Sequence, residues 1–237
     1  LLLGVVVLYE HESYTELCNA YKVPENVRET VQLVLTNVTS EERELLLLGN
    51  KDTVVTIAYV APDLIAIPAD IPQMSQGMKL RALLLPELRE MLMEAKKDGV
   101  TLRVLSAYRS FERQKAIYER MITQYGKEYA MRVSAPPGHS QHQLGVAIDF
   151  NSLEQEFGAS KEGKWLADHA YRFGFSISYP QGEESFTGYM YEPWHYRYVG
   201  KKAAAIIYLI FSNNQERFLR FCREFFSLSE SAQRTGD

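Results

Sequence analysis

The chain has 237 residues, of which 46% are hydrophobic and 24% are charged. This size is sufficient for a buried core, and it fits one large domain or one domain with an extension. The formal net charge of -4 argues against a chain that binds nucleic acid by overall electrostatic attraction. The only cysteines, Cys18 and Cys222, form no CxxC pair, which excludes a thiolate zinc site. Two buried thiols are favoured over a disulfide between them.

The first 75 residues differ from the rest of the chain. The opening LLLGVVVL (1–8) is too short for a membrane helix, and we interpret it either as the remnant of a signal peptide or anchor, or as a buried strand. Pro24 and the capping box formed by Thr39 and Glu42 predict two short helices. The run VVTIAYV (54–60) predicts a strand. We expect residues 1–75 to form an N-terminal extension that wraps the main domain.

From residue 76 onward the pattern alternates between helices and strands. Apolar residues at helical spacing predict a helix over 78–98, in which Pro86 either lies in the first turn or causes a kink. The β-branched run VTLRVLSA predicts a strand. Further elements follow in order: helix 111–125, strand 144–150, helix 164–173, strands 175–179 and 189–198, and a helix from 201. We therefore divide the chain into an extension (1–75), a main domain (76–212) and a C-terminal helix and tail (213–237).

Two separate segments carry the side chains of a metal site. GHSQHQLGVAIDFN (138–151) contains His142 and Asp149, and the later EPWH contains Glu192 and His195. Two imidazoles and one carboxylate are a common ligand set for a catalytic zinc, which keeps one position open for water. The remaining carboxylate is then available as a proton acceptor. These residues indicate a catalytic zinc site that activates water, which is our working hypothesis.

The spacing leaves alternatives open for each residue. Asp149 lies in the apolar run VAIDF, where its charge needs either a divalent cation or an arginine as partner. Glu192 and His195 would point to opposite faces of a regular strand, so a shared site requires a turn or bulge at Pro193. Taken alone, this segment favours a surface strand with a solvated glutamate and a half-buried histidine, and the metal site gains support only together with His142 and Asp149. Arg109 follows a predicted strand, where it either holds a carboxylate or oxyanion or forms a surface salt bridge.

The other histidines are weaker candidates. His139 lies in the same loop as His142 and competes with it as a ligand, but His142 stands in the better relation to the following strand. His169 falls in an amphipathic helix, where a structural role is favoured, and His11 is given no role.

The chain resembles the zinc D-alanyl-D-alanine carboxypeptidases of the VanY type, which share a fold with hedgehog signalling domains. Four segments, which lie between about 100 and 200, carry this resemblance through their order and combination. They are SAYRSFERQ (106–114), SQHQLGVAIDF (140–150), WLADHAYRFGF (165–175) and EPWHYRYVG (192–200). The resemblance implies an α+β fold in which helices flank a small antiparallel sheet.

Carried over position by position, the resemblance implies a role for each site residue. His142, Asp149 and His195 would bind zinc, and Glu192 would be the general base toward a zinc-bound water. Arg109 would stabilise the anionic substrate or intermediate. The substrate pocket would be lined by Ser106, Gln114, Ser140 and Trp194.

The implied reaction is hydrolysis of the C-terminal D-alanine from peptidoglycan stem peptides. Since that substrate lies outside the cytoplasm, we expect an exported periplasmic or cell-envelope enzyme, with a membrane anchor upstream of residue 1 as an option, and we expect a monomer that binds no nucleic acid. The alternatives are an L,D-carboxypeptidase or a peptidoglycan endopeptidase of the same fold. A zinc-containing cell-wall-binding module without catalysis is disfavoured, because Glu192 and Arg109 are both present.

Overall fold

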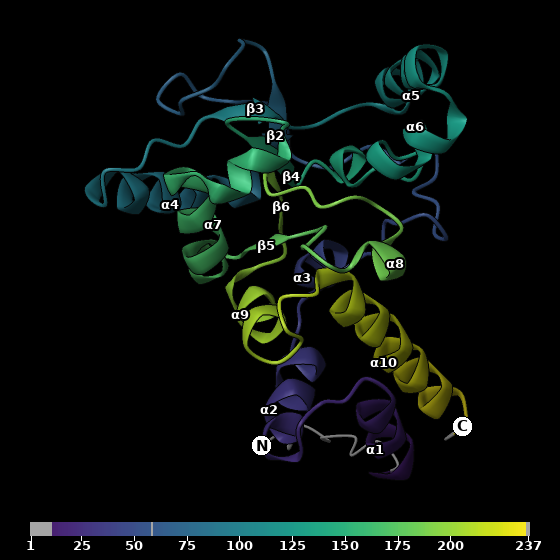
Figure 1. Cartoon of the computed structure of the whole chain (residues 1–237). Coiled ribbons are helices and arrows are strands. Elements are labelled where there is room, and N and C mark those ends of the chain that lie inside the picture. Colours follow the sequence, from purple (N-terminus) through teal and green to yellow (C-terminus); the bar gives the residue numbers. More distant parts are fainter. Residues whose placement is uncertain (1–10, 58, 236–237) are drawn as a thin grey trace.

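The computed structural model describes residues 11–57 and 59–235 (Figure 1). The interpretations offered for residues 1–8 lie outside this range. The helices are α1 His11–Ala20, α2 Glu25–Thr36, α3 Ser40–Leu45, α4 Leu85–Lys97, α5 Phe111–Tyr125, α6 Lys127–Val133, α7 Lys161–His169, α8 Glu184–Thr187, α9 Lys201–Leu209 and α10 Gln215–Thr235. Short 3-10 turns η1 to η4 span Ala82–Leu84, Gln141–Leu144, Gln155–Ala159 and Ala170–Phe173.

A four-stranded antiparallel sheet forms the centre of the molecule. Its strand order is β3-β4-β6-β5, and its strands are β3 Val104–Ser106, β4 Ala147–Phe150, β5 Phe175–Ile177 and β6 His195–Tyr198. A separate hairpin pairs β1 Leu64–Ala66 with β2 Lys79–Arg81. Helices flank the sheet, as Figure 1 shows. This arrangement confirms the expected α+β fold with a small antiparallel sheet.

Two apolar cores lie on different parts of the fold. The first joins the sheet to α4 and α7 and includes Leu88, Met91, Ile148, Phe150 and Phe175, each fully buried. Because neighbouring residues of a strand point to opposite faces, Ile148 and Phe150 fill this core while Asp149 faces the other way. The strand that carries Asp149 is therefore supported from one side by tight apolar packing.

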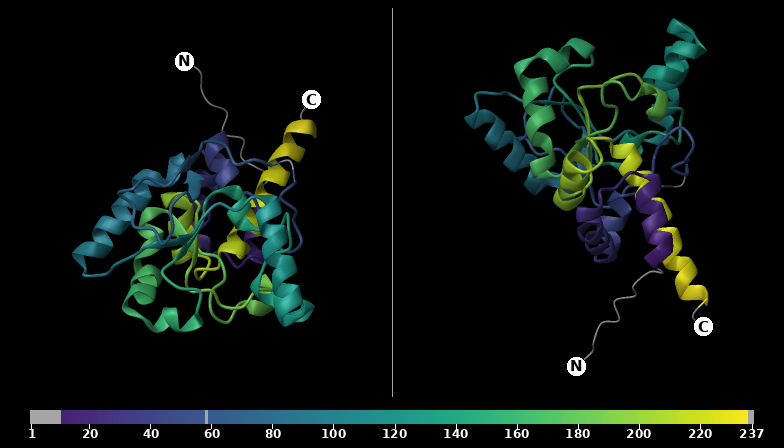
Figure 2. Two further views of the ribbon diagram at one scale, coloured as in Figure 1. Left: turned by 90° about the horizontal axis from the view of Figure 1, so that it is seen from above. Right: turned by 60° about the horizontal axis from the view of Figure 1, so that its bottom comes forward.

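The second core is helical and joins the two ends of the chain. Residues of α1, α2, α9 and α10 form it, and Figure 2 shows α1 lying alongside α10. Cys18 and Cys222 are both free and buried here, which confirms the expectation of two buried thiols. Polar contacts tie the residue 45–50 segment to the rest of the protein. Arg197 donates through Nη2 to the Leu45 carbonyl at 2.8 Å, and Asn50 donates to Glu216 Oε1 at 2.7 Å.

Substitution of Phe221 tests how much the second core contributes to stability. Its ring is fully buried and lies within 5.5 Å, centroid to centroid, of the Tyr21 and Phe211 rings. We expect Phe221→Ala to lower the free energy of unfolding by roughly 3–5 kcal/mol, because it removes buried apolar area and leaves a cavity. Urea denaturation measures this loss. Leu209→Ala, at a residue that is 69% exposed, is the control and should leave the unfolding midpoint nearly unchanged.

One predicted strand and the start of one predicted helix were wrong. The capping box of Thr39 and Glu42 is present, and Pro86 lies in the first turn of α4. The helix expected over 78–98 begins only at Leu85, because residues 79–81 pair with β1 as strand β2. No strand forms among the described residues of 54–60. The backbone of this segment bonds to a loop instead: Val55 N donates to the Gly138 carbonyl at 2.6 Å, and the Thr56 carbonyl accepts from Gln143. A β-branched run forms a strand only when another strand is available to pair with it.

Candidate metal centre

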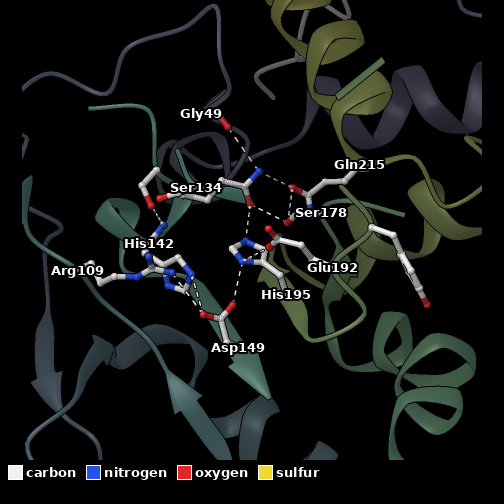
Figure 3. Close-up of polar contacts among 12 residues, drawn as sticks. Gly49, Arg109, Ser134, His142, Asp149, Ser178, Glu192, His195 and Gln215 are labelled. Carbon is white, nitrogen blue, oxygen red and sulfur yellow. Dashed lines mark hydrogen bonds and ion pairs between the residues drawn. The ribbon is translucent and has the colours of Figure 1, made fainter. Parts of the chain in front are cut away.

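The sheet places Asp149 and His195 side by side. Asp149 on β4 is paired directly with His195 on β6, and with Ser106 on β3. Directly paired residues project their side chains to the same face of a sheet. His195 Nδ1 consequently lies 2.9 Å from Asp149 Oδ1 (Figure 3). The pairing of β4 with β6 thus joins the two sequence segments singled out as ligand carriers.

His142 reaches the same point from η2. Ser140 is the N-cap of this turn and accepts from the His142 amide, and Gly145 ends the turn with φ 74°, a left-handed conformation that suits glycine. His142 Nδ1 lies 2.6 Å from the carbonyl oxygen of Ala107, which can only accept a hydrogen bond. Nδ1 therefore carries the proton, and Nε2 presents its lone pair toward Asp149.

The three donor groups fit a divalent metal. His142, Asp149 and His195 are all buried, and their ligand atoms lie within 4.8 Å of one another. His142 Nε2 is 3.3 Å from Asp149 Oδ2, yet it is buried and makes no hydrogen bond. A buried polar atom with no partner is costly, and a metal ion would satisfy it. Two imidazoles and a carboxylate suit zinc and leave a position for water.

The protonation states support metal binding. Burial and the charge of Arg109 lower the pKa of His142 to about 4, so its imidazole is neutral at pH 7 and available as a ligand. Burial by itself would raise the pKa of Asp149, but the adjacent His142 and His195 imidazoles hold it well below its usual value. The centre therefore presents a neutral imidazole and a carboxylate anion, the forms that bind metals.

Glu192 lies beside this centre. A turn at Pro193 and Trp194 precedes β6, and the His195 amide donates back to the Glu192 carbonyl at 3.1 Å, which brings both side chains to one site as expected. Glu192 Oε2 lies 3.6 Å from His195 Nδ1. Burial and the nearby Asp149 charge raise the pKa of Glu192 well above its usual value. Its carboxylate is accordingly a stronger base than an exposed glutamate.

Arg109 approaches from the end of β3. It donates through Nη1 to Gln114 Oε1 at 2.9 Å and through Nη2 to Asp149 Oδ2 at 3.4 Å. Gln114 is held in turn by its bond to the Ala135 carbonyl at 2.6 Å. Arg109 Nε is buried without a partner. The guanidinium is thus oriented toward the centre by Gln114 and Asp149.

All nine residues singled out from the sequence line one cavity of about 730 Å³. Its walls include Ser106, Gln114, Ser140 and Trp194. The cavity also contains residues that the sequence pattern did not identify, among them Tyr179, whose ring lies 5.0 Å from that of His195. Gln141 also lines it, and its only sequence signal was its position next to His142.

The competing histidines take no part in the cluster. His139 Nδ1 lies 2.8 Å from the Asn50 carbonyl, in the N-terminal segment. His169 stacks on Trp165 and bonds to the Trp165 carbonyl. A three-ligand centre beside a buried carboxylate and a guanidinium is typical of a catalytic metal site, because a structural zinc is usually enclosed by four protein ligands.

Comparison with known proteins agrees with this class. Residues 77–201 match the family described as VanY, D-alanyl-D-alanine carboxypeptidase. A Bacillus subtilis (strain 168) protein named "Putative carboxypeptidase YodJ" is 39% identical over 171 residues, which are 69% of this chain and 63% of that protein. The D-alanyl-D-alanine carboxypeptidase of Enterococcus faecalis (strain ATCC 700802 / V583) is 32% identical over 78% of this chain and 70% of its own length. This chain therefore spans somewhat less than two thirds of the first relative.

Solved structures give the same result. The LdcB LD-carboxypeptidase matches with a TM-score of 0.69 and 36% identity, over 76% of this chain and 88% of LdcB. A variant of the vancomycin resistance D,D-pentapeptidase VanY in complex with Zn(II) matches with a TM-score of 0.63 and 32% identity, over 74% of this chain and 99% of the other. The chain belongs to the VanY family of D-alanyl-D-alanine carboxypeptidases, which confirms the resemblance seen in the sequence.

Proposed function

We propose that this protein is a zinc-dependent carboxypeptidase that removes the C-terminal D-alanine from peptidoglycan stem peptides. The observation that carries the proposal is the convergence of three metal-ligating side chains with Glu192 and Arg109 in one cavity. A related VanY was solved with Zn(II), and VanYB was solved with D-alanine-D-alanine. The proposed catalytic domain, residues 76–212, contains the whole of the matched region 77–201.

Zinc bound by His142, Asp149 and His195 would supply Lewis-acid chemistry and acidify water. Glu192 accepts the proton of the attacking water and delivers it to the departing amine nitrogen as the peptide C–N bond breaks. Arg109 lines the cavity and places its positive charge where it stabilises the negative charge that develops on the substrate oxygen. Asp149 and Gln114 hold the guanidinium in place for this task.

The remaining wall residues are proposed to bind the substrate. Ser106 and Ser140 offer hydroxyl groups, Gln114 an amide and Trp194 an apolar surface, and all four line the cavity. Ser106 is paired across the sheet with Asp149, so a peptide that contacts Ser106 lies next to the metal ligands.

The second candidate is an L,D-carboxypeptidase. The solved LdcB LD-carboxypeptidase matches with a higher TM-score and identity than the VanY structures named above, which favours this alternative. The two activities are distinguished by substrate. A D,D-carboxypeptidase releases D-alanine from a stem pentapeptide that ends in D-Ala-D-Ala, whereas an L,D-carboxypeptidase releases it from a tetrapeptide. Mass spectrometry of both digests, under the same conditions, decides between them.

We also propose an extracytoplasmic location, because peptidoglycan lies outside the cytoplasm. Among the residues that the structure describes, no helix is both long and apolar enough to cross a membrane. A monomer that acts on the stem peptide is the proposed working form. Secretion of the native gene product, followed by cell fractionation, tests the location.

Metal dependence tests the proposed function directly. Dialysis against a chelator should abolish D-alanine release, because the three donors then have no ion to hold, and added Zn²⁺ should restore it. Elemental analysis of the purified protein should find about one zinc per chain, since four-coordinate catalytic sites hold a single ion. A folded protein that takes up no zinc and still releases D-alanine would refute the proposal.

Arg109→Lys tests the charge-stabilising role. A lysine places its charge on one nitrogen and lacks the planar fork with which Arg109 bonds Gln114 through one nitrogen and Asp149 through another. We expect kcat/KM for the stem peptide to fall by roughly 10²–10³-fold, the usual cost of removing an oxyanion donor. Arg103→Lys is the control, because Arg103 is exposed and lies outside the cavity. Equal activity of both variants would assign Arg109 to the surrounding structure instead.

A further inference from the structure

A buried polar network lies behind His195, on the side away from Asp149 (Figure 3). It consists of Gln141, Ser178 and Gln215, which we call the glutamine relay. These side chains are 5%, 1% and 0% exposed, so none of them has bulk water as a partner. Gln215 is the first residue of α10 and lies beyond the matched region 77–201. Two buried amide side chains in one network require a structural or functional reason.

Backbone carbonyls set the orientation of both amides. Gln215 Nε2 donates to the Ser176 carbonyl at 3.1 Å, and a carbonyl can only accept, so Gln215 Oε1 must face the other way. Gln141 Nε2 donates to this Oε1 at 3.4 Å and to the Gly49 carbonyl at 3.5 Å. The Gln141 amide oxygen is thereby turned toward Ser178 Oγ, at 2.7 Å, and toward His195 Nε2, at 3.4 Å.

Both ring nitrogens of His195 face acceptors, Asp149 Oδ1 and Gln141 Oε1. Since the proposed zinc would lie on the side of Asp149, Nε2 keeps the hydrogen and donates it to Gln141 Oε1. Nδ1, which lies 2.9 Å from Asp149 Oδ1, is then the nitrogen that binds a metal. His142 is arranged in the opposite sense, because its Nδ1 faces the Ala107 carbonyl directly. One imidazole is thus oriented by a carbonyl, and the other by two amides in series.

We propose that Gln141 and Gln215 are positioning residues that fix the tautomer and ring orientation of His195 for zinc. The inference rests on the proposed zinc site. It gives the C-terminal helix α10 and the Gly49 segment a part in metal binding, although both lie outside the matched region. Partners of this kind usually change metal affinity by about 10–100-fold when removed.

The experiment compares zinc dissociation constants, obtained by chelator competition, with the absorption spectrum of the Co²⁺-substituted protein. Gln141→Met removes the acceptor at nearly constant volume, whereas Gln141→Glu keeps an acceptor for His195 but buries a charge. Gln143→Met is the matched control. Gln143 is also buried and lies two residues away, but its amide donates to the Thr56 carbonyl and has no bond to His195.

A positioning role and a packing role for Gln141 predict opposite orders of zinc affinity for Gln141→Met and Gln141→Glu. If Gln141 positions His195, Gln141→Met weakens zinc binding by about 10–100-fold and shifts the Co²⁺ spectrum, and Gln141→Glu binds zinc more tightly than Gln141→Met. If the site needs only packing, Gln141→Glu is the worse variant, because it buries a charge. Gln143→Met should match the wild-type protein in both measurements.

Two results would overturn the inference: wild-type zinc affinity in Gln141→Met, or equal losses in Gln141→Met and Gln143→Met. If Gln141→Glu does not fold, Gln215→Met is compared with Gln143→Met in the same way, and it should weaken zinc binding because the anchor to the Ser176 carbonyl is lost. A wild-type protein that binds no zinc contradicts the proposed function itself. If the wild-type protein binds zinc, but no more tightly than Gln141→Met does, only the positioning role of the glutamine relay is contradicted and the proposed function stands.

Discussion

Replacing Glu192 with glutamine is expected to lower kcat for D-alanine release by roughly 10²–10⁴-fold, the usual contribution of a general base. Glutamine has nearly the same shape but cannot accept the proton of the attacking water. The zinc content should stay at the wild-type level, because Glu192 is not among the three clustered donors. Steady-state kinetics and elemental analysis of the same sample measure the two quantities together.

Glu29→Gln is the control for this variant, since Glu29 is exposed on α2, far in sequence from the cavity residues. It makes the same chemical change and should leave kcat unchanged. Near-full activity of Glu192→Gln would mean that another group accepts the proton. Loss of zinc together with activity would instead make Glu192 part of the metal-binding set.

Asp149→Asn is expected to abolish activity by releasing the metal. The carboxylate is the single anion among the three donors, and it also accepts from Arg109. A neutral amide binds Zn²⁺ poorly and brings an N–H₂ group toward the imidazoles. We expect the zinc dissociation constant to rise by more than the ~10–100-fold that accompanies loss of an outer-shell partner. Chelator competition followed by spectroscopy measures it.

Asp70→Asn is the matched control, because Asp70 forms an exposed ion pair with Arg89 at 2.8 Å and makes no contact with the centre. It should bind zinc as the wild-type protein does. Circular dichroism must show that Asp149→Asn is folded before its zinc affinity is interpreted. A folded Asp149→Asn with unchanged affinity would remove Asp149 from the ligand set and leave the two histidines in need of another partner.

The candidate site was predictable as a set of residue types but not as a geometry. His142, Asp149 and His195 were chosen because zinc prefers imidazole and carboxylate donors. The turn at Pro193 was required by that choice, and the structure has it. The partners of these ligands were not predictable. Ala107 offers its backbone carbonyl, which leaves no trace in the sequence, and Gln215 lies 74 residues from Gln141.

In the fold, too, local features were predictable from the sequence and long-range pairing was not. The capping box at Thr39 and the first-turn position of Pro86 followed local rules, because the groups that satisfy them lie within one turn of the chain. The predicted strand over 54–60 failed, because pairing depends on a neighbour from elsewhere. β4 and β6 were predicted as strands that begin too early, since their alternating patterns continue into segments that form turns.

The sequence by itself determined which candidate groups this protein carries, namely the imidazoles, carboxylates and guanidinium of the candidate site, and the local turns that precede them. The tertiary structure decided that these groups meet. Pairing of β4 with β6 sets Asp149 opposite His195 across 46 residues of chain, and α10 returns Gln215 to the back of the same histidine. The physical reason is that residue type and local backbone preference are properties of short segments, whereas strand register and helix docking depend on contacts between distant ones.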